Sequence, residues 1–465
     1  MQTTHVSVVD RTSSGARDRA LRILSDADLQ ELDAAAVRIV ENVGVAMPAA
    51  VAREALAAAG AEIDGARVRI RGDLLHDLAG RAPRHLTLGA RAAATLTTGT
   101  GSLLTTDGCC TEIYDITDGE KRPTTAQDVA DISRLVDALD QIDFCWPAVS
   151  AQDVPVERRG LCELYLALAN TGKHVQTVTI VEPGPARTAV EMALAIAGGE
   201  AELRAAPPIS ALLGTVTPLG NDAGTLEAAL VFAAAGVPIG FVTMPMGGST
   251  TPLSEAGSLA VGVAEALTAV AVVQAAYPGA QVFICFIPSF MDLKSGDFTG
   301  GAPEDTVMGA AVGDIGRYYG LPTQCGVNSA GAKASGWQTA VDDVATTFLS
   351  LLNGVDMLTG VGMVAGGRIF SLEEMLLATQ VTVCARSLAA AVGLRETPGS
   401  AAASLLPVSG AGGGPDRDRL DGDGEDAVGW SLRRARDLLA THVPAPLADD
   451  IDDELRRLAG APQRP

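Results

Sequence analysis

Histidine and lysine are both scarce in this chain, and their scarcity narrows the chemistry that it can perform. Only five of its 465 residues are histidines, and only four of its 34 basic residues are lysines. No histidine falls in a loop that follows a predicted strand. We therefore expect neither a histidine general base nor a histidine-rich metal centre.

Cysteines are few, and their spacing excludes another class of site. The seven cysteines contain no Cys-x-x-Cys pair, so a structural zinc site is not expected and we predict no bound metal. Five of them lie in apolar runs that are typical of core residues. Cys109 and Cys110 are adjacent, and we interpret them as core or loop residues, with a redox role as the alternative.

The chain also lacks the features of nucleic-acid-binding and membrane proteins. Its formal net charge is −22, which argues against nucleic acids and anionic membrane surfaces as partners. The first thirty residues have no apolar stretch typical of a signal peptide. No run of about 18 residues reads as a spanning helix, because acidic residues interrupt the alanine-rich runs. We expect a cytoplasmic protein.

What the chain does have is a regular alternation of apolar runs and helical patterns. Runs of strand length are predicted at 144–149, 174–181, 209–216, 237–244, 281–287, 323–327 and 357–364. Helical patterns separate them at 158–170, 185–198, 222–235, 254–276, 304–319, 338–353 and 371–391. Continuous apolar strands that alternate with helices predict an α/β fold, a (β/α)8 TIM-type barrel. The candidate for an eighth strand is Leu405 to Ser409.

The flanking segments predict the domain organisation. The barrel is expected over 124–396, between an N-terminal α+β extension at 23–123 and C-terminal helices at 428–465. Residues 1–22 read as a flexible leader. Residues 397–427 are rich in Gly and Asp, which predicts a flexible excursion that cannot bury enough apolar surface to stay ordered.

In a β/α barrel, the loops that follow the strands form the working face. Here these loops are dominated by Gly, Ser, Thr and Asn, with isolated aromatic and acidic residues: Trp146, Phe290, Trp337, Asp153, Glu255 and Asp292. Aromatic faces beside carboxylates suit a quaternary ammonium ion. The alternative is that these aromatics pack into the core.

Further polar residues in the same loops could bind the carboxylate that a betaine carries. Arg368 is a candidate ion-pair partner, and Asn328 and Gln338 are candidate hydrogen-bond donors, unless they cap the helices that follow. Lys333 lies just after the sixth predicted strand, where a lysine could also form a Schiff base with a carbonyl substrate.

Several segments together resemble the trimethylamine methyltransferase family, in its branch without pyrrolysine. They are residues 114–125, Asp143-Phe144 with residues 152–155, residues 245–252 (Pro-Met-Gly-Gly-Ser-Thr-Thr-Pro), Met291-Asp292 with Gly296 and Phe298, and residues 332–338. The resemblance implies a methyltransferase that moves a methyl group from a small quaternary amine, such as a betaine, to the cobalt of a corrinoid (cobalamin) carried by a partner protein. It also implies that Gly247, Gly248, Ser249 and Thr250 let the corrinoid approach, and a homo-oligomer is expected.

Two other functions stay open. The family's histidine-containing segment has no counterpart between Arg395 and Trp430, which motivates a barrel that binds a cationic metabolite without catalysis. The second alternative is an enzyme of another class that uses Lys333 for Schiff-base chemistry.

Overall fold

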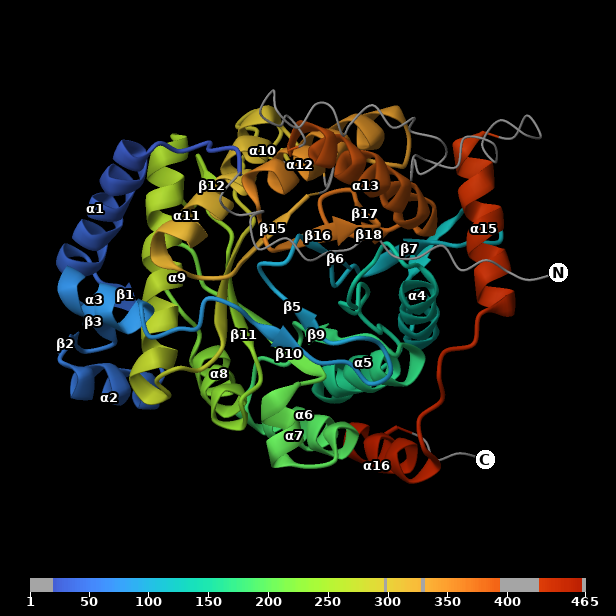
Figure 1. Ribbon diagram of the computed structural model, residues 1–465, viewed down its shortest axis with the longest axis horizontal. Coiled ribbons are helices and arrows are strands. Elements are labelled where there is room, and N and C mark those ends of the chain that lie inside the picture. Colours follow the sequence, from blue (N-terminus) through green and yellow to red (C-terminus); the bar gives the residue numbers. More distant parts are fainter. Residues whose placement is uncertain (1–19, 297–298, 328–330, 394–425, 462–465) are drawn as a thin grey trace, which may run out of the picture.

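Seven parallel strands and one bridging segment form the barrel, and the strands are almost entirely buried. The structure, a computed structural model, describes residues 20–296, 299–327, 331–393 and 426–461. Seven strands form one parallel sheet in the order β6-β16-β15-β13-β11-β10-β9 (Figure 1). Segment 144–145 joins its two edges through the parallel bridges Thr105–Phe144 and Cys145–Val175. The predicted β/α barrel is thereby confirmed. The sheet strands are β6 (Leu103–Thr106), β9 (Val175–Thr177), β10 (Ile209–Gly214), β11 (Ile239–Thr243), β13 (Val282–Phe286), β15 (Thr323–Gly326) and β16 (Met357–Val361).

One barrel strand lies where the sequence pattern predicts none. β6 pairs with β16 from Leu103 to Thr106, within the residues predicted to form the N-terminal extension. The strand is only four residues long and half threonine, so it lacks the continuous apolar run by which the other strands are recognised. The predicted candidate for the eighth strand, Leu405 to Ser409, lies outside the described residues.

The barrel helices surround the sheet, and their caps follow from the sequence. For example, the Ser254 side chain accepts a hydrogen bond from the Gly257 N–H at the start of α9, an N-cap arrangement. The helices are α4 (Ala126–Ala138), α5 (Val156–Asn170), α6 (Pro183–Ala197), α7 (Glu200–Ala205), α8 (Ala223–Ala235), α9 (Glu255–Ala276), α10 (Pro303–Ala310), α11 (Val312–Tyr319), α12 (Trp337–Asn353) and α13 (Leu372–Gly393).

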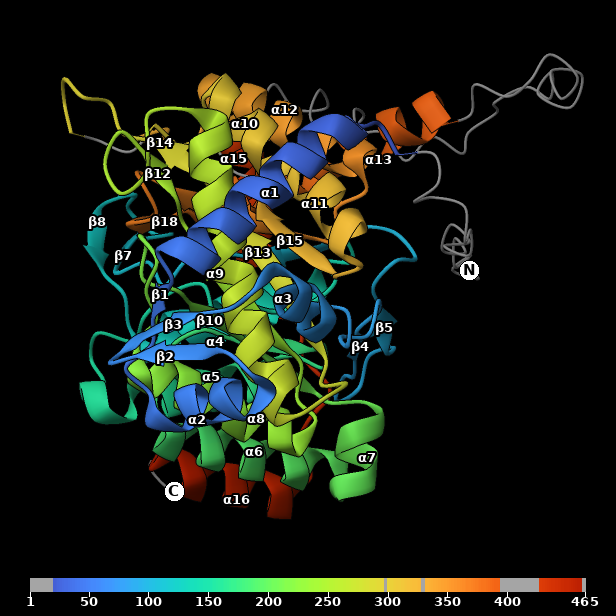
Figure 2. The same ribbon diagram turned by 90° about the vertical axis from the view of Figure 1, so that its left-hand side faces the viewer.

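The N-terminal extension covers the outer side of α9. α1 (Asp26–Asn42), α2 (Ala50–Ala59) and α3 (Gly72–Ala79) all pack against α9 (Figure 2), beside a small sheet of β1 (Val45–Ala46), β3 (Arg67–Arg69) and β2 (Glu62–Asp64). α9 and α13 are long and apolar enough to cross a membrane, contrary to the expectation from sequence, but the apolar window of α9 is 89% buried. This burial explains why α9 is apolar on all sides: it is a core helix.

The barrel interior is filled by side chains, as a TIM-type barrel requires. A Cβ on Gly240 would lie 2.2 Å from the Phe283 ring, so the missing side chain of β11 makes room for the large one of β13. Gln176 and Gln324 exchange amide hydrogen bonds of 3.1 and 3.2 Å between β9 and β15. One end of the interior is plugged by Leu88, from the hairpin of β4 (Thr87–Leu88) and β5 (Leu96–Thr97).

Two C-terminal helices return along the barrel wall. α15 (Ala427–Thr441) packs against α13 and α4, and α16 (Asp449–Ala459) packs against α5 and α6 (Figure 1). The Tyr165 hydroxyl donates to Asp452 Oδ1 at 3.0 Å, and the guanidinium of Arg456 lies 5.4 Å from the Tyr165 ring centroid. The predicted C-terminal helices are therefore part of the folded barrel.

Candidate functional site

The mouth of the barrel is built from loops at the carboxyl ends of the strands, and one side of it carries a second sheet. This sheet has the order β17-β18-β7-β8 and consists of β17 (Met363–Val364), β18 (Ile369–Phe370), β7 (Glu112–Tyr114) and β8 (Lys121–Pro123). It follows β16 and β6 in the chain and therefore stands above those two strands. The loop between β6 and β7, residues 107–111, is thus held inside the mouth.

Asp107 is the first residue after β6, and its carboxyl group is buried in the mouth. The residue is 4% exposed, and burial raises the pKa of its carboxyl to about 7. The Gly108 N–H and the Thr359 hydroxyl favour the ionised form but offset only part of that effect. The pKa of the Cys285 thiol on β13 is raised by burial and, to a lesser extent, by the charge of Asp107. A carboxyl that is half-protonated near neutral pH marks a candidate functional site.

Trp146, which was predicted as a site residue, lies in the wall of the barrel interior on the segment whose backbone hydrogen-bonds the Thr106 hydroxyl, one residue before Asp107. It belongs to the apolar cluster of the barrel interior and is 3% exposed. Its Nε1 makes no hydrogen bond within the described part of the chain. The indole N–H lies beside the Cys109 thiol, whose pKa is raised to about 12 by burial and by the charges of Glu163 and Asp107. Cys109 is partly exposed, so the site lies just beneath the mouth surface.

This arrangement is suited to binding a cation. Asp107 can carry a negative charge in surroundings that exclude water, and the neighbouring segment carries Trp146, an aromatic residue of the type that attracts cations. An organic cation would favour the ionised form of Asp107 and offset the cost of burying its charge. Cys109 remains a neutral thiol because its pKa is raised to about 12, so it is not poised as a nucleophile.

The Gly-Gly stretch forms a tight packing turn at the rim of the mouth. β12 (Met246–Gly247) pairs in parallel with β14 (Ser289–Phe290), and the N–H groups of Ser249 and Thr250 donate to the Met246 carbonyl at 3.1 and 3.0 Å. A Cβ on Gly247 would lie 2.3 Å from the Phe290 ring, and Gly248 has a left-handed φ of 84°. Packing accounts for both glycines and for the position of Phe290, whereas corrinoid contact at these residues stays a prediction.

Most of the other predicted site residues lie on the exposed surface rather than around Asp107. Asp153 caps α4 by accepting from the Ala126 N–H at 2.8 Å, and Asp292 accepts from the Lys294 N–H within its own turn. Arg368 pairs with Glu112 at 3.1 Å. The exposed residues of this group are Asp153, Asp292, Lys333, Trp337, Gln338 and Arg368. Asn328 lies outside the described residues.

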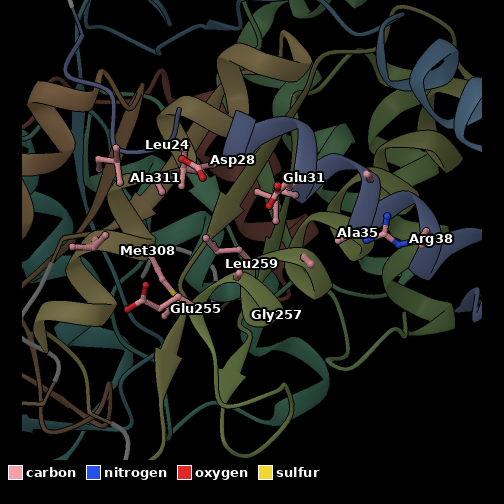
Figure 3. A pocket seen from close by; sticks show the side chains of 16 residues that line it. Leu24, Asp28, Glu31, Ala35, Arg38, Glu255, Gly257, Leu259, Met308 and Ala311 are labelled. Carbon is pink, nitrogen blue, oxygen red and sulfur yellow. The ribbon is translucent and has the colours of Figure 1, made fainter. Parts of the chain in front are cut away.

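Glu255 lies in a different place, outside the barrel. It stands in the first turn of α9 and lines a cavity of about 530 Å³ between α1, α9 and α10 (Figure 3). Leu24 and Met308 are among the apolar side chains that line the same cavity. The structure therefore places Trp146 on the segment next to β6, the strand that Asp107 follows, whereas Glu255, Asp153 and Asp292 lie elsewhere.

Asp107 is the site residue that sequence reasoning missed. A signal was present, because Leu-Leu-Thr-Thr followed by Asp-Gly has the form of a short strand that ends in a mouth loop. Within the residues described here, no group of three or more His, Cys, Asp or Glu side chains is arranged to hold a metal ion.

Comparison with known proteins shows that the chain is similar to methyltransferases. Residues 4–413 match the family described as "Trimethylamine methyltransferase (MTTB)". The trimethylamine methyltransferase MttB of Desulfitobacterium hafniense is 30% identical over 383 residues, which are 79% of this chain and 74% of that protein. Glycine betaine methyltransferase from strain Y51 of the same species is 26% identical over 363 residues, 77% and 75% of the two chains.

Other relatives match over a shorter span. The trimethylamine methyltransferase MttB of Methanosarcina barkeri is 30% identical over 252 residues, so the match spans 54% of this chain and about half, 51%, of that relative. Among solved structures, the monomethylamine methyltransferase of Methanosarcina barkeri aligns over 92% of this chain and 97% of its own, with 12% identity and a TM-score of 0.49.

Proposed function

Because the chain belongs to the trimethylamine methyltransferase family, we propose that it transfers a methyl group from a small quaternary amine, such as a betaine, to the cobalt of a partner corrinoid protein. The observation that carries this proposal is the buried Asp107 carboxyl at the end of β6, next to the barrel segment that carries Trp146. A glycine betaine methyltransferase among the relatives supports the same substrate class.

The residues of the mouth have a limited task in this reaction. The reduced cobalt of the partner would supply the nucleophile, so the chain has to bind the amine, orient it and exclude water. Asp107 would pair with the positive nitrogen, and Trp146 would cover it. The nitrogen loses its positive charge as the C–N bond breaks, so Asp107 favours the bound substrate more than the transition state. We therefore assign to Asp107 the binding of the substrate cation. The residues around it position the substrate and exclude water.

The test is spectroscopic. The purified protein is mixed with Co(I)-cobalamin or with a corrinoid protein from the same genome, and with a panel of trimethylated amines. We expect one compound to convert the Co(I) spectrum to that of methyl-Co(III). D107N should raise the KM for that compound, whereas D292N, which alters an exposed carboxylate, should not. Tight binding without conversion under any condition would refute methyl transfer and would favour a non-catalytic binder. The Schiff-base alternative gains no support, because Lys333 is exposed.

A further inference from the structure

Glu163, on α5, is a buried carboxylate whose partners lie in two mouth loops. The residue is 1% exposed. Its Oε1 accepts from the Ala151 N–H at 2.9 Å, and its Oε2 accepts from the Thr179 hydroxyl at 2.9 Å. Ala151 follows the barrel segment 144–145, and Thr179 follows its neighbour β9. One carboxylate thus fastens two adjacent loops to the helix behind them.

A chain of backbone hydrogen bonds connects the first of these loops to the candidate site. The Ser150 N–H donates to the Cys110 carbonyl at 2.9 Å, and the N–H groups of Cys109 and Cys110 donate to the Ala148 carbonyl at 3.1 and 3.0 Å. Cys109 has a φ of 92°, a left-handed conformation that a residue with a Cβ adopts only where its surroundings impose it. The position of residues 148–151 therefore determines the position of Cys109, two residues after Asp107.

Trp146 is tied to the same segment. Its backbone N–H donates to the Thr106 hydroxyl at 3.1 Å, and that hydroxyl donates to the Trp146 carbonyl at 2.6 Å. The indole ring itself has no hydrogen bond to hold it within the described residues. Its orientation is set by packing in the apolar cluster and by the backbone on either side, which is anchored at Thr106 and, five residues after Trp146, at Ala151 by Glu163.

We propose that Glu163 is a positioning residue for the Asp107–Trp146 site. By fixing Ala151 and Thr179, it sets the orientation of Trp146 and the closure of the wall at Cys109. The substrate part of this inference rests on the proposed function, whereas the geometric part does not. A matched control is available in Glu265 of α9, which is fully buried and makes the same kinds of contact with the loop after β10. It accepts from the hydroxyls of Thr215 and Thr217 at 2.7 and 2.9 Å and from the Leu219 N–H at 2.7 Å.

The experiment measures the surroundings of Trp146 and the accessibility of Cys109. In a background that carries W337F and W430F, Trp146 is the only tryptophan, since the chain has three. We expect E163A to shift its fluorescence emission to the red and to increase labelling of Cys109 by a thiol reagent, followed by mass spectrometry. E163Q should restore both readouts, because its amide oxygen can accept from Ala151 and its amide N–H can donate to Thr179. E265A should lower the melting temperature to a similar degree without changing the Trp146 emission.

The functional readout is the KM for the active quaternary amine, which we expect E163A to raise by about tenfold or more through misplacement of the wall. If E163A unfolds, T179V is used instead of E163A in every assay, because it removes only the contact between Glu163 and the Thr179 hydroxyl. Emission and Cys109 labelling like those of the wild type in a folded variant would overturn the proposal and leave Glu163 with a stabilising role alone. These two readouts need no methyl transfer, so they remain decisive even if the proposed reaction fails.

Discussion

Titration of Asp107 should make the binding of a quaternary ammonium ion depend on pH. Burial holds the pKa of this carboxyl at about 7 in the ligand-free protein. A cation binds the ionised form, so binding has to remove the proton when the pH is below 7. The affinity should therefore be constant at high pH and should fall as the pH decreases through 7.

The size of this effect follows from the pKa. The apparent Kd is the intrinsic Kd multiplied by the reciprocal of the ionised fraction of Asp107. With a pKa of about 7, this factor is about 1.1 at pH 8, about 11 at pH 6 and about 100 at pH 5. Between pH 8 and pH 6 the affinity should fall about tenfold, which corresponds to ~1.4 kcal/mol. The same linkage requires that binding below pH 7 releases up to one proton per site.

Isothermal titration calorimetry with tetramethylammonium, an ion that does not titrate, measures the Kd at each pH. Repeating it in buffers of different ionisation enthalpy measures the number of protons released on binding. D107N should bind about 10- to 100-fold more weakly at pH 8, as expected for the loss of a charge-assisted contact, and its Kd should not change with pH. The other buried acid near the wall is Glu163, whose pKa is raised by burial, and E163Q separates its contribution. A constant Kd between pH 8 and pH 6 in the wild type, or the same slope in D107N, would refute the assignment of Asp107.

Three further predictions test the energetics around the mouth. D107N should be more stable than the wild type at pH 8, by up to roughly 4 kcal/mol, and little changed at pH 4. The reason is that the raised pKa of Asp107 makes folding of the wild type less favourable as the pH rises from 3.8 to about 7. Urea unfolding at the two pH values measures this difference, and an equal effect of the substitution at both would contradict it. W146L should bind tetramethylammonium about 5- to 30-fold more weakly in the same calorimetry, from the loss of ~1–2 kcal/mol of cation–π attraction, whereas W337L should bind like the wild type because Trp337 is 85% exposed. G247A should lower stability by about 1–3 kcal/mol, because the added Cβ would lie 2.3 Å from the Phe290 ring; a smaller loss in G247A/F290A than the two single losses combined would show that the clash is the cause.

The fold could be predicted from sequence because its strands are buried on both faces. Continuous apolar runs such as those of β11 and β13 have the length and composition of parallel strands, and helices such as α8 and α9 begin at side chains that accept from a first-turn N–H. β6 could not be recognised in this way, because two of its four residues are threonines and its partner β16 lies more than 250 positions away in the chain. Only the closed barrel shows that β6 is needed, because it pairs with β16 on one side and with segment 144–145 on the other.

The candidate site was predictable only in part, and for a related reason. Trp146 was identified as an aromatic residue suited to a cation, and the structure places it in the apolar cluster of the barrel interior, on the segment next to β6. Asp107 was missed together with its strand. Asp153 and Asp292 were predicted from their loops, but loop membership does not determine where a side chain points: each carboxylate accepts a hydrogen bond from a nearby backbone N–H on the surface instead.

Three locally unfavourable features coincide around residues 105–109 and 146. Asp107 is a buried acid with a raised pKa, Trp146 Nε1 and Thr105 Oγ1 are buried without partners in the described chain, and Cys109 has a left-handed backbone. Each of these costs folding free energy, while buried acids elsewhere, such as Glu265, are satisfied by several donors. A ligand that carries positive charge would remove the largest of these costs at Asp107. The coincidence of a buried acid with a raised pKa and a left-handed non-glycine residue two positions later is typical of a functional site and supports binding at this place.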